Sequence, residues 1–158
     1  MSALVTGGAG FIGRHVVSEL LQRGQPVRVF DDLSRAHPDS LDEFKSNSDF
    51  LGLVHADVTD VAVVDREAAR AEIIYHLAAN VDVGASVREP AEAVRANLLG
   101  TLSVADAARR RGLRLVLIST CHVYASAEEP LSECAPTVPA SPYAASKLAG
   151  EIIARSYA

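Results

Sequence analysis

The sequence predicts an α/β fold in which a doubly wound parallel sheet carries helices on both faces. Two observations support this prediction. Five short apolar runs alternate with segments of helical spacing, and the runs are mostly continuous rather than alternating in polarity, as expected for strands buried on both faces. The length of 158 residues, of which 49% are hydrophobic and 22% charged, suits one domain with a sizeable core, and we assign residues 1–158 to it.

The elements follow in strand–helix–strand order. The expected strands are residues 3–6, 27–30, 50–54, 73–78 and 113–118. Helical spacing connects Ile12, Val16, Leu20 and Leu21, then Val61, Val64, Ala68 and Ala71, and later Val94, Leu98, Leu102 and Ala105. Gly24 and Gly112 stand where helices are expected to end, the second directly after the basic residues 109–111. Residues 125–142, rich in Pro, Ser and Ala and without periodicity, predict a long surface loop.

Charge and composition narrow the classes of partner. The net charge of −5 argues against a broad nucleic-acid surface, and no apolar stretch is long enough to span a membrane. The N-terminal segment lacks the basic start and long apolar core of a signal peptide. Cys121 and Cys134 have neither the spacing of a disulfide framework nor that of a zinc site, so we expect no metal and a reduced, cytoplasmic setting.

The segment "TGGAGFIG" lies between the first expected strand and the first expected helix, and it carries regularly spaced glycines. Glycines at these places let the backbone approach a dinucleotide pyrophosphate, and the N–H groups at the start of the helix can bind the anion. Glycines at this spacing can also form a simple tight turn, but the strand before and the helix after favour a phosphate loop. We expect the cofactor to contact Gly7, Gly10, Phe11, Ile12 and Gly13.

An acidic residue follows the second expected strand, in the segment "FDDLSR". The carboxylate of Asp31 can accept hydrogen bonds from both hydroxyls of an adenosine ribose and would repel a 2′-phosphate, so NAD is favoured over NADP. Arg35 could pair with such a phosphate, which keeps NADP open as the alternative. We interpret Asp32 as a loop residue that caps the next turn.

The segment "SPYAASKLAGE" places Tyr143 and Lys147 four residues apart in an expected helix that begins near Pro142. This spacing puts both side chains on one face of the helix. Such a pair is usually surface chemistry, but beside a bound nicotinamide it can transfer a proton. A free phenol has a pKa of about 10, and an adjacent ammonium together with a cationic nicotinamide ring would stabilise phenolate nearer neutral pH.

These segments, together with "DDLS", "ADVTD", "HLAA", "SVREP", "NLLGT" and "STCHVYA", resemble the extended short-chain dehydrogenase/reductase family, specifically its NAD-dependent nucleotide-sugar epimerases and dehydratases. They run in family order along nearly the whole chain. The resemblance implies a Rossmann sheet, with Tyr143 and Lys147 as catalytic residues. Family members continue past this helix with a further strand and a C-terminal lobe that holds the substrate nucleotide, so we expect the chain to lack these parts.

The resemblance also implies further contacts around the cofactor and the sugar. The additional cofactor-binding residues would be Asp57 and Val58 beside the adenine, Leu77, Ala78 and Ala79 in the cleft, Asn97, Ser119, Tyr143 and Lys147. Asn97 would support the active-site helix, although it could instead face solvent. Ser86 would bind the substrate near the sugar or its phosphates, or else cap the helix that Pro90 begins.

The segment "STCHVYA" departs from the family pattern. The resemblance implies that Thr120 contacts the substrate hydroxyl that is oxidised. In the next two places, sugar 4,6-dehydratases carry an Asp-Glu pair and 4-epimerases carry non-titrating residues, whereas this chain has Cys121 and His122. A thiol and an imidazole can serve as acid and base near neutral pH, so both are candidate catalytic residues. The alternative is that Cys121 packs and His122 faces solvent.

We therefore predict an NAD-dependent nucleotide-sugar epimerase or dehydratase that transiently oxidises sugar C4, with a UDP- or dTDP-linked hexose as its substrate. The alternative is a non-catalytic NAD-binding module that lacks the substrate lobe. The sequence does not separate epimerisation from dehydration, and it leaves a homodimer open.

Overall fold

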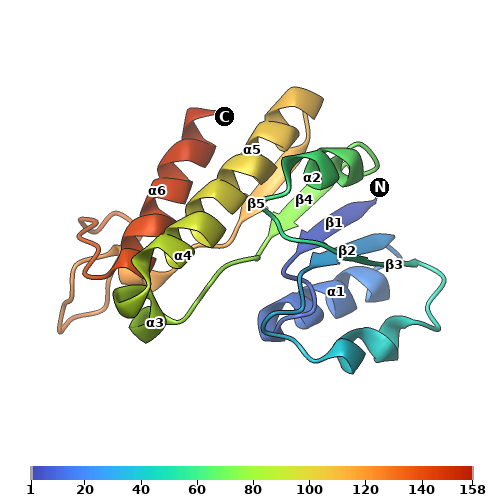
Figure 1. Ribbon diagram of the computed structural model, residues 1–158, viewed down its shortest axis with the longest axis horizontal. Helices are drawn as coiled ribbons and strands as arrows, with labels where there is room; N and C mark the ends of the chain where they lie inside the picture. The colour runs from blue at the N-terminus through green and yellow to red at the C-terminus, as the bar shows by residue number, and fades with distance from the viewer. Residues whose placement is uncertain (1, 158) are drawn as a thin grey trace.

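The computed structural model describes residues 2–157, which form one five-stranded sheet with helices on both faces (Figure 1). The strands are β1 (Ala3–Thr6), β2 (Val27–Asp31), β3 (Phe50–His55), β4 (Ile73–His76) and β5 (Arg114–Leu117). Their order is β3-β2-β1-β4-β5, and every neighbouring pair is parallel. The predicted doubly wound parallel sheet is confirmed, with β1 at the centre, where the strand order reverses.

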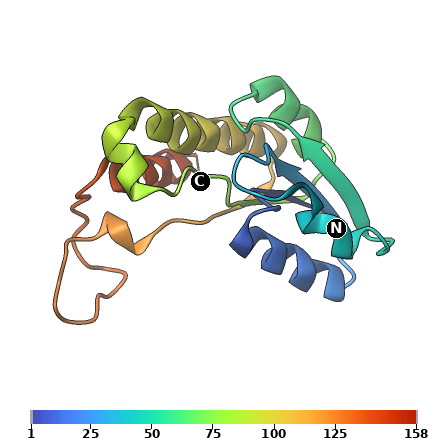
Figure 2. The same ribbon diagram turned by 60° about the horizontal axis from the view of Figure 1, so that its bottom comes forward.

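Helical segments connect the strands. They are α1 (Phe11–Gln22), the 3₁₀ segment η1 (Pro38–Phe44), α2 (Val61–Ala68), α3 (Val83–Arg88), α4 (Pro90–Val94), the π-helical turn η2 (Arg95–Leu99), α5 (Gly100–Arg111), the 3₁₀ turn η3 (Cys121–Val123) and α6 (Pro142–Ser156). Helices α1 and α5 lie on opposite sides of the sheet, and α6 lies alongside α5 (Figures 1 and 2). The predicted helix end at Gly112 is confirmed, since that residue has a left-handed φ of 63°.

Alternate residues of the central strand face two separate cores. Ala3 and Val5 of β1 pack with Val17 of α1 on the face that η1 also covers. Leu4 points to the other face and packs with α2 and with Val104 of α5. Both faces of the sheet are therefore apolar, which explains why the strands read as continuous hydrophobic runs.

The helical segment from α4 to α5 differs from its sequence-based expectation in the face that it buries. Val94 and Leu102, which belong to the predicted apolar stripe, are exposed, whereas Asn97 and Thr101 are buried. Small and polar side chains face inward here because α5 packs closely against both α2 and α6. The predicted helix is confirmed, but two of the four residues of its apolar stripe are exposed, while Leu98 is half-buried and Ala105 is buried.

The predicted long loop precedes α6 and projects from the body of the molecule (Figure 2). Residues 125–141 are mostly exposed, and an isolated antiparallel bridge between Tyr124 and Thr137 ties one end of the loop to its later part. Among residues 2–157, no helix combines the length and the apolar character needed to cross a membrane.

Candidate functional site

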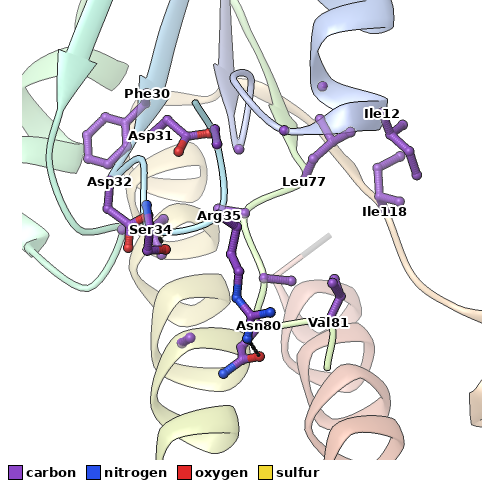
Figure 3. A pocket seen from close by; sticks show the side chains of 18 of the residues that line it. Ile12, Phe30, Asp31, Asp32, Ser34, Arg35, Leu77, Asn80, Val81 and Ile118 are labelled. Carbon is purple, nitrogen blue, oxygen red and sulfur yellow. Dashed lines mark hydrogen bonds between the residues drawn. The ribbon is translucent and has the colours of Figure 1, made fainter. Parts of the chain in front are cut away.

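A cavity of about 760 Å³ opens at the carboxyl ends of the strands, beside the point where the strand order reverses (Figure 3). Open α/β sheets bind their ligands at such a point, and the volume lies in the range of small-molecule sites. The residues predicted to bind a cofactor all line this cavity, with the exception of Asn97. They are Gly7, Gly10, Phe11, Ile12, Gly13, Asp31, Asp57, Val58, Leu77, Ala78, Ala79, Ser119, Tyr143 and Lys147.

The glycine loop between β1 and α1 is tightly packed on its inner side. Gly7 has a φ of 71°, and a Cβ there would lie 2.6 Å from the backbone nitrogen of Ala78. A Cβ on Gly13 would lie 2.1 Å from the carbonyl oxygen of Gly7, whereas the nearest atom to a Cβ on Gly10 would be 3.3 Å away. No side chain caps the N-terminus of α1, so the N–H groups of its first turn are available to an anion in the cavity.

Asp31 ends β2 and faces the cavity (Figure 3). Its two carboxylate oxygens accept the backbone N–H groups of Ala9, at 3.0 Å, and of Leu33, at 2.9 Å. Burial raises the pKa of Asp31 above its ordinary value, although these two hydrogen bonds oppose the shift. The neighbouring Asp32 accepts the N–H of Ser34 at 3.0 Å, which confirms its interpretation as a cap of the following turn.

Arg35 extends across the cavity from the loop after β2 (Figure 3). One of its guanidinium nitrogens donates to the side-chain oxygen of Asn80 at 3.2 Å, and another lies 4.0 Å from the carboxylate of Asp82. The Arg35 guanidinium therefore contacts residues that follow β4 and not the carboxylate of Asp31.

Helix α6 presents the predicted catalytic pair to the cavity. The helix begins directly after Ser141, whose hydroxyl caps its first turn. Tyr143 and Lys147 are buried, with exposed fractions of 7% and 6%. The Lys147 Nζ donates to the carbonyl oxygen of Ile118 at 2.6 Å, and burial lowers the pKa of Lys147 from its ordinary value. The structure thus places a buried phenol one helical turn from a buried amine.

Asn97 lies in the π turn η2 and connects two walls of the site. Its side-chain nitrogen donates to the carbonyl oxygen of Asn80 and to the hydroxyl of Ser146, both at 3.0 Å. Its side-chain oxygen accepts the N–H of Asn80 at 2.7 Å. The alternative that Asn97 faces solvent is wrong, because only 1% of the residue is exposed. Asn97 does not line the cavity, but it links the loop after β4 to α6, which carries Lys147.

Ser86 lies in α3 and contacts the first turn of α6. Its hydroxyl donates to the carbonyl oxygen of Val83 at 2.6 Å and accepts the N–H of Tyr143 at 3.2 Å. The alternative that Ser86 caps the next helix is wrong, since Glu89 occupies that N-cap position. The contact with a sugar stays a prediction, and in this structure the residue is fully buried.

An ion pair between Arg95 and Asp57 borders the cavity, where Val58 also lies. Arg95 of η2 contacts the carboxylate of Asp57 at 2.9 Å and donates to the hydroxyl of Thr59 at 2.8 Å. Burial alone would raise the pKa of Asp57, but hydrogen bonds from Thr59 and Arg95 outweigh burial and lower it. Asp57 is therefore held as a carboxylate at the place predicted for the adenine.

The segment "STCHVYA" leads from β5 into η3, which the hydroxyl of Thr120 caps by accepting the N–H of His122 at 3.2 Å. The ring of His122 meets that of Tyr143 edge-on, with 6.0 Å between centroids. Cys121 and Cys134 are exposed free thiols. Within residues 2–157, no three His, Cys, Asp or Glu side chains gather in a way that could hold a metal ion. The catalytic role of Cys121 and His122 as acid and base stays a prediction.

Sequence reasoning missed the role of His76 at the end of β4. This residue is 1% exposed, and its ring nitrogens lie 2.6 Å from the hydroxyl of Thr6 and 3.1 Å from that of Thr101. Thr101 donates its own proton to the carbonyl oxygen of Asn97 at 2.6 Å, so its oxygen accepts the hydrogen bond from His76. The histidine is neutral, because burial, followed by the charge of Lys147, lowers its pKa to about 3. A polar residue ending an apolar run was the available signal.

Glu151 was also missed. It follows Lys147 by one helical turn in α6 and accepts a hydrogen bond from the hydroxyl of Ser119, two residues after the end of β5. The repeated four-residue spacing after Tyr143 and Lys147 was the signal in the sequence.

A parallel sheet with a glycine loop at its reversal point is a Rossmann-like arrangement. The chain belongs to the NAD dependent epimerase/dehydratase family, whose model matches residues 3–158. The family resemblance inferred from the sequence motifs is therefore confirmed.

Individual relatives agree with this membership. The chain is 41% identical to the UDP-glucose 4-epimerase of Mycolicibacterium smegmatis, over 99% of this chain and 51% of that protein. It is 34% identical to the dTDP-glucose 4,6-dehydratase of the same organism, over 99% and 49%. The crystal structure of the Thermus thermophilus UDP-glucose 4-epimerase in complex with NAD matches with a TM-score of 0.89 and 36% identity, over 99% and 50%. The chain thus spans about half the length of these relatives.

Proposed function

We propose that the chain binds NAD in the cavity beside the glycine loop and takes part in the epimerisation or dehydration of a nucleotide-linked hexose, through transient oxidation at sugar C4. One observation carries this proposal: the glycine loop, Asp31 and the Tyr143–Lys147 pair all line a single cavity. The names of the two M. smegmatis relatives refer to UDP-glucose and dTDP-glucose, which supports a UDP- or dTDP-linked hexose as substrate.

The residues present fit a dinucleotide. The uncapped first turn of α1 offers N–H groups to a pyrophosphate, and the absence of a side chain on Gly10 leaves room for its approach. Asp31 would accept the hydroxyls of the adenosine ribose, and Asp57 with Val58 would flank the adenine. Tyr143 and Lys147 would hold the nicotinamide ribose.

Proton transfer falls to the side chains of α6. When bound, NAD supplies the acceptor for the hydride of sugar C4. Tyr143 takes the proton of the C4 hydroxyl as general base, and the ammonium of Lys147 stabilises the phenolate. Thr120 would hydrogen-bond the same substrate hydroxyl and align it with Tyr143. Because Tyr143 and Lys147 are buried, the charge of Lys147 would act on a phenolate with less screening than in water.

Calorimetric titration with NAD and NADP tests the cofactor. We expect NAD to bind more tightly, because the carboxylate of Asp31 repels a 2′-phosphate and Arg35 is engaged across the cavity. Asp31→Asn should reduce the preference for NAD, and Arg35→Gln should leave it in place. Tighter binding of NADP by the unaltered chain would contradict the assignment.

A turnover assay with UDP-glucose and dTDP-glucose separates the enzyme from the non-catalytic module. A chain that converts either sugar nucleotide is an enzyme. A chain that binds NAD with ordinary affinity and converts neither substrate would support the module instead.

Of the two overall reactions, dehydration is favoured by the contact between His122 and Tyr143, because this contact brings an exposed titratable ring against the proposed base, which lines the cavity. Elimination requires proton exchange at the carbon beside C4, whereas epimerisation does not. Solvent deuterium should enter that carbon during dehydration, and His122→Ala or Cys121→Ala should block elimination while reduced cofactor accumulates. Normal turnover of both variants without deuterium incorporation would assign an epimerase.

Several expectations on partners and location are part of this proposal. A homodimer would cover exposed apolar side chains on neighbouring helices, namely Leu99, Leu102 and Ile152. Sedimentation velocity of the protein measures its oligomeric state directly. A cytoplasmic location and the absence of nucleic-acid binding stay predictions.

A further inference from the structure

One face of α6 carries a third polar residue in line with the proposed catalytic pair. Tyr143, Lys147 and Glu151 follow one another at four-residue intervals, which places them on the same side of the helix. The side chain of Glu151 is 17% exposed, so it lies mostly inside the protein. Carboxylates are seldom buried to this extent without a partner.

Glu151 and Lys147 both hold the strand end, meaning the two residues that directly follow Leu117 of β5. The Lys147 Nζ donates to the carbonyl oxygen of Ile118 at 2.6 Å, and one carboxylate oxygen of Glu151 accepts the hydroxyl of Ser119. Two successive residues of the strand end are thus fixed to one helix face. Thr120, which is expected to align the substrate, follows them immediately, so its position depends on these two contacts.

The carboxylate also acts on Lys147 through its charge. Burial disfavours the ammonium form of Lys147, and the negative charge of Glu151 opposes this effect. Tyr143 precedes Lys147 by one turn of the same helix, and His76 of β4, which the charge of Lys147 also affects, is neutral. Glu151 therefore supplies the negative charge that favours a protonated Lys147 in its buried setting.

The second oxygen of Glu151 faces outward. It contacts Arg155 at 3.2 Å, and the side chain of Arg155 is 80% exposed. An exposed ion pair of this kind contributes little. The interactions of Glu151 that matter to the site are therefore those directed inward, toward Ser119 and Lys147.

We propose that Glu151 is a positioning residue of the Tyr143–Lys147 site, acting on the strand end through Ser119 and on Lys147 through its charge. The proposal rests on the proposed function in naming these residues as the reacting site. The two actions are separable, because glutamine at this position keeps the hydrogen-bond acceptor and removes the charge.

The test measures Lys147 directly and does not require turnover. The chain contains only two lysines, Lys45 and Lys147, so a sample with isotope-labelled lysine gives two side-chain NMR signals. Lys45→Arg assigns them, and Lys45, which is exposed, is the internal reference. In Glu151→Gln, the Lys147 signal should titrate at lower pH than in the unaltered chain, while Lys45 is unchanged. Arg155→Gln is the matched control and should not move the Lys147 titration.

The contact with Ser119 has its own readout. Backbone amide signals of residues 118–120 should stay in place in Glu151→Gln and shift in Glu151→Ala and in Ser119→Ala. Ser119→Ala should leave the Lys147 titration unchanged. An identical Lys147 titration in the unaltered chain and in Glu151→Gln would overturn the proposal. Failure of NAD binding or turnover, with the predicted NMR changes present, would instead count against the proposed function alone.

Discussion

The cavity is built in two different ways at its two working regions. Around the glycine loop, the walls are backbone: Gly7 and Gly13 leave no room for a Cβ, and the groups offered to a ligand are N–H donors of α1. Around α6, the working groups are side chains, and residues from other elements hold them. Asn97 from η2 bonds Ser146, and Ser86 from α3 bonds the N–H of Tyr143.

This difference determines which substitutions disrupt each region. It also determines how much of each region can be predicted from the sequence. A backbone cradle depends on the absence of side chains within one short segment, so adding a single methyl group changes it. A side-chain site depends on partners that are distant in sequence, so it is sensitive to changes far from the reacting groups. Variants in each region separate these behaviours.

The largest effect is expected at the side-chain region, from Tyr143→Phe. Removing the phenolic hydroxyl removes the proposed general base and should lower turnover of UDP-glucose or dTDP-glucose by roughly 10²–10⁴-fold. NAD affinity, measured by calorimetry, should change little because the ring and Lys147 remain. A loss of less than tenfold would mean that another group takes the proton.

The glycine loop should respond in two distinct ways. Gly13→Ala places a methyl group 2.1 Å from the Gly7 carbonyl oxygen and should cost about 3 kcal/mol in the free energy of unfolding, measured with urea. Gly10→Val meets no atom closer than 3.3 Å at its Cβ, so it should cost less in stability and mainly weaken NAD binding. Equal NAD affinity in Gly10→Val and the unaltered chain would mean that this loop does not cradle the pyrophosphate.

Asn97→Ala tests whether distant partners hold the side-chain region. It leaves buried groups of Asn80 and Ser146 without their partner and should cost about 2 kcal/mol in the free energy of unfolding. Asn80→Ala is the comparison variant, since it keeps the backbone groups that Asn97 bonds and removes only the side-chain oxygen that accepts from Arg35 and from the N–H of Asp82, so it should cost about 1 kcal/mol or less. Equal costs for the two variants would contradict the role of Asn97.

The smallest effect is a pH dependence that arises from His76. Its pKa is about 3 in the folded chain and 6.5 in the unfolded chain, so the unfolded state binds more protons between these values. The stability contributed by the neutral ring is present above pH 6.5 and is lost as the pH falls, by roughly 1 kcal/mol at pH 5.5. Urea unfolding from pH 7.5 to 5.5 measures this slope, and His76→Gln should reduce it. An unchanged slope in that variant would assign the acid sensitivity to other groups.

The same contrast explains which features could be predicted from the sequence. The strand runs, the glycine spacing and the Tyr143–Lys147 spacing are local patterns, and they gave the fold and the walls of the cavity. The support around α6 joins segments far apart in the chain, so Asn97 and Ser86 were assigned by resemblance with alternatives that proved wrong. His76 and Glu151 were missed because their partners, Thr6 and Ser119, lie on other elements. The buried face of α5 was predicted only in part: Ala105 is buried but Leu102 is exposed, because small residues rather than large apolar ones fill a close helix contact.

The π turn η2 constrains the number of residues between the helix positions on either side of it. Asn97 within this turn reaches α6, whereas Val104 and Ala108 beyond it pack with α2 and the sheet. Each residue rotates an α-helix by about 100°, and a π turn amounts to one inserted residue, so η2 sets the angle between the helix face that carries Asn97 and the face that carries Val104 and Ala108. Removing a single residue between Arg95 and Leu99 would restore a regular helix and turn one of these faces away. Among homologous chains, the spacing between Asn97 and Ala108 should therefore vary less than the identity of the exposed residues between them.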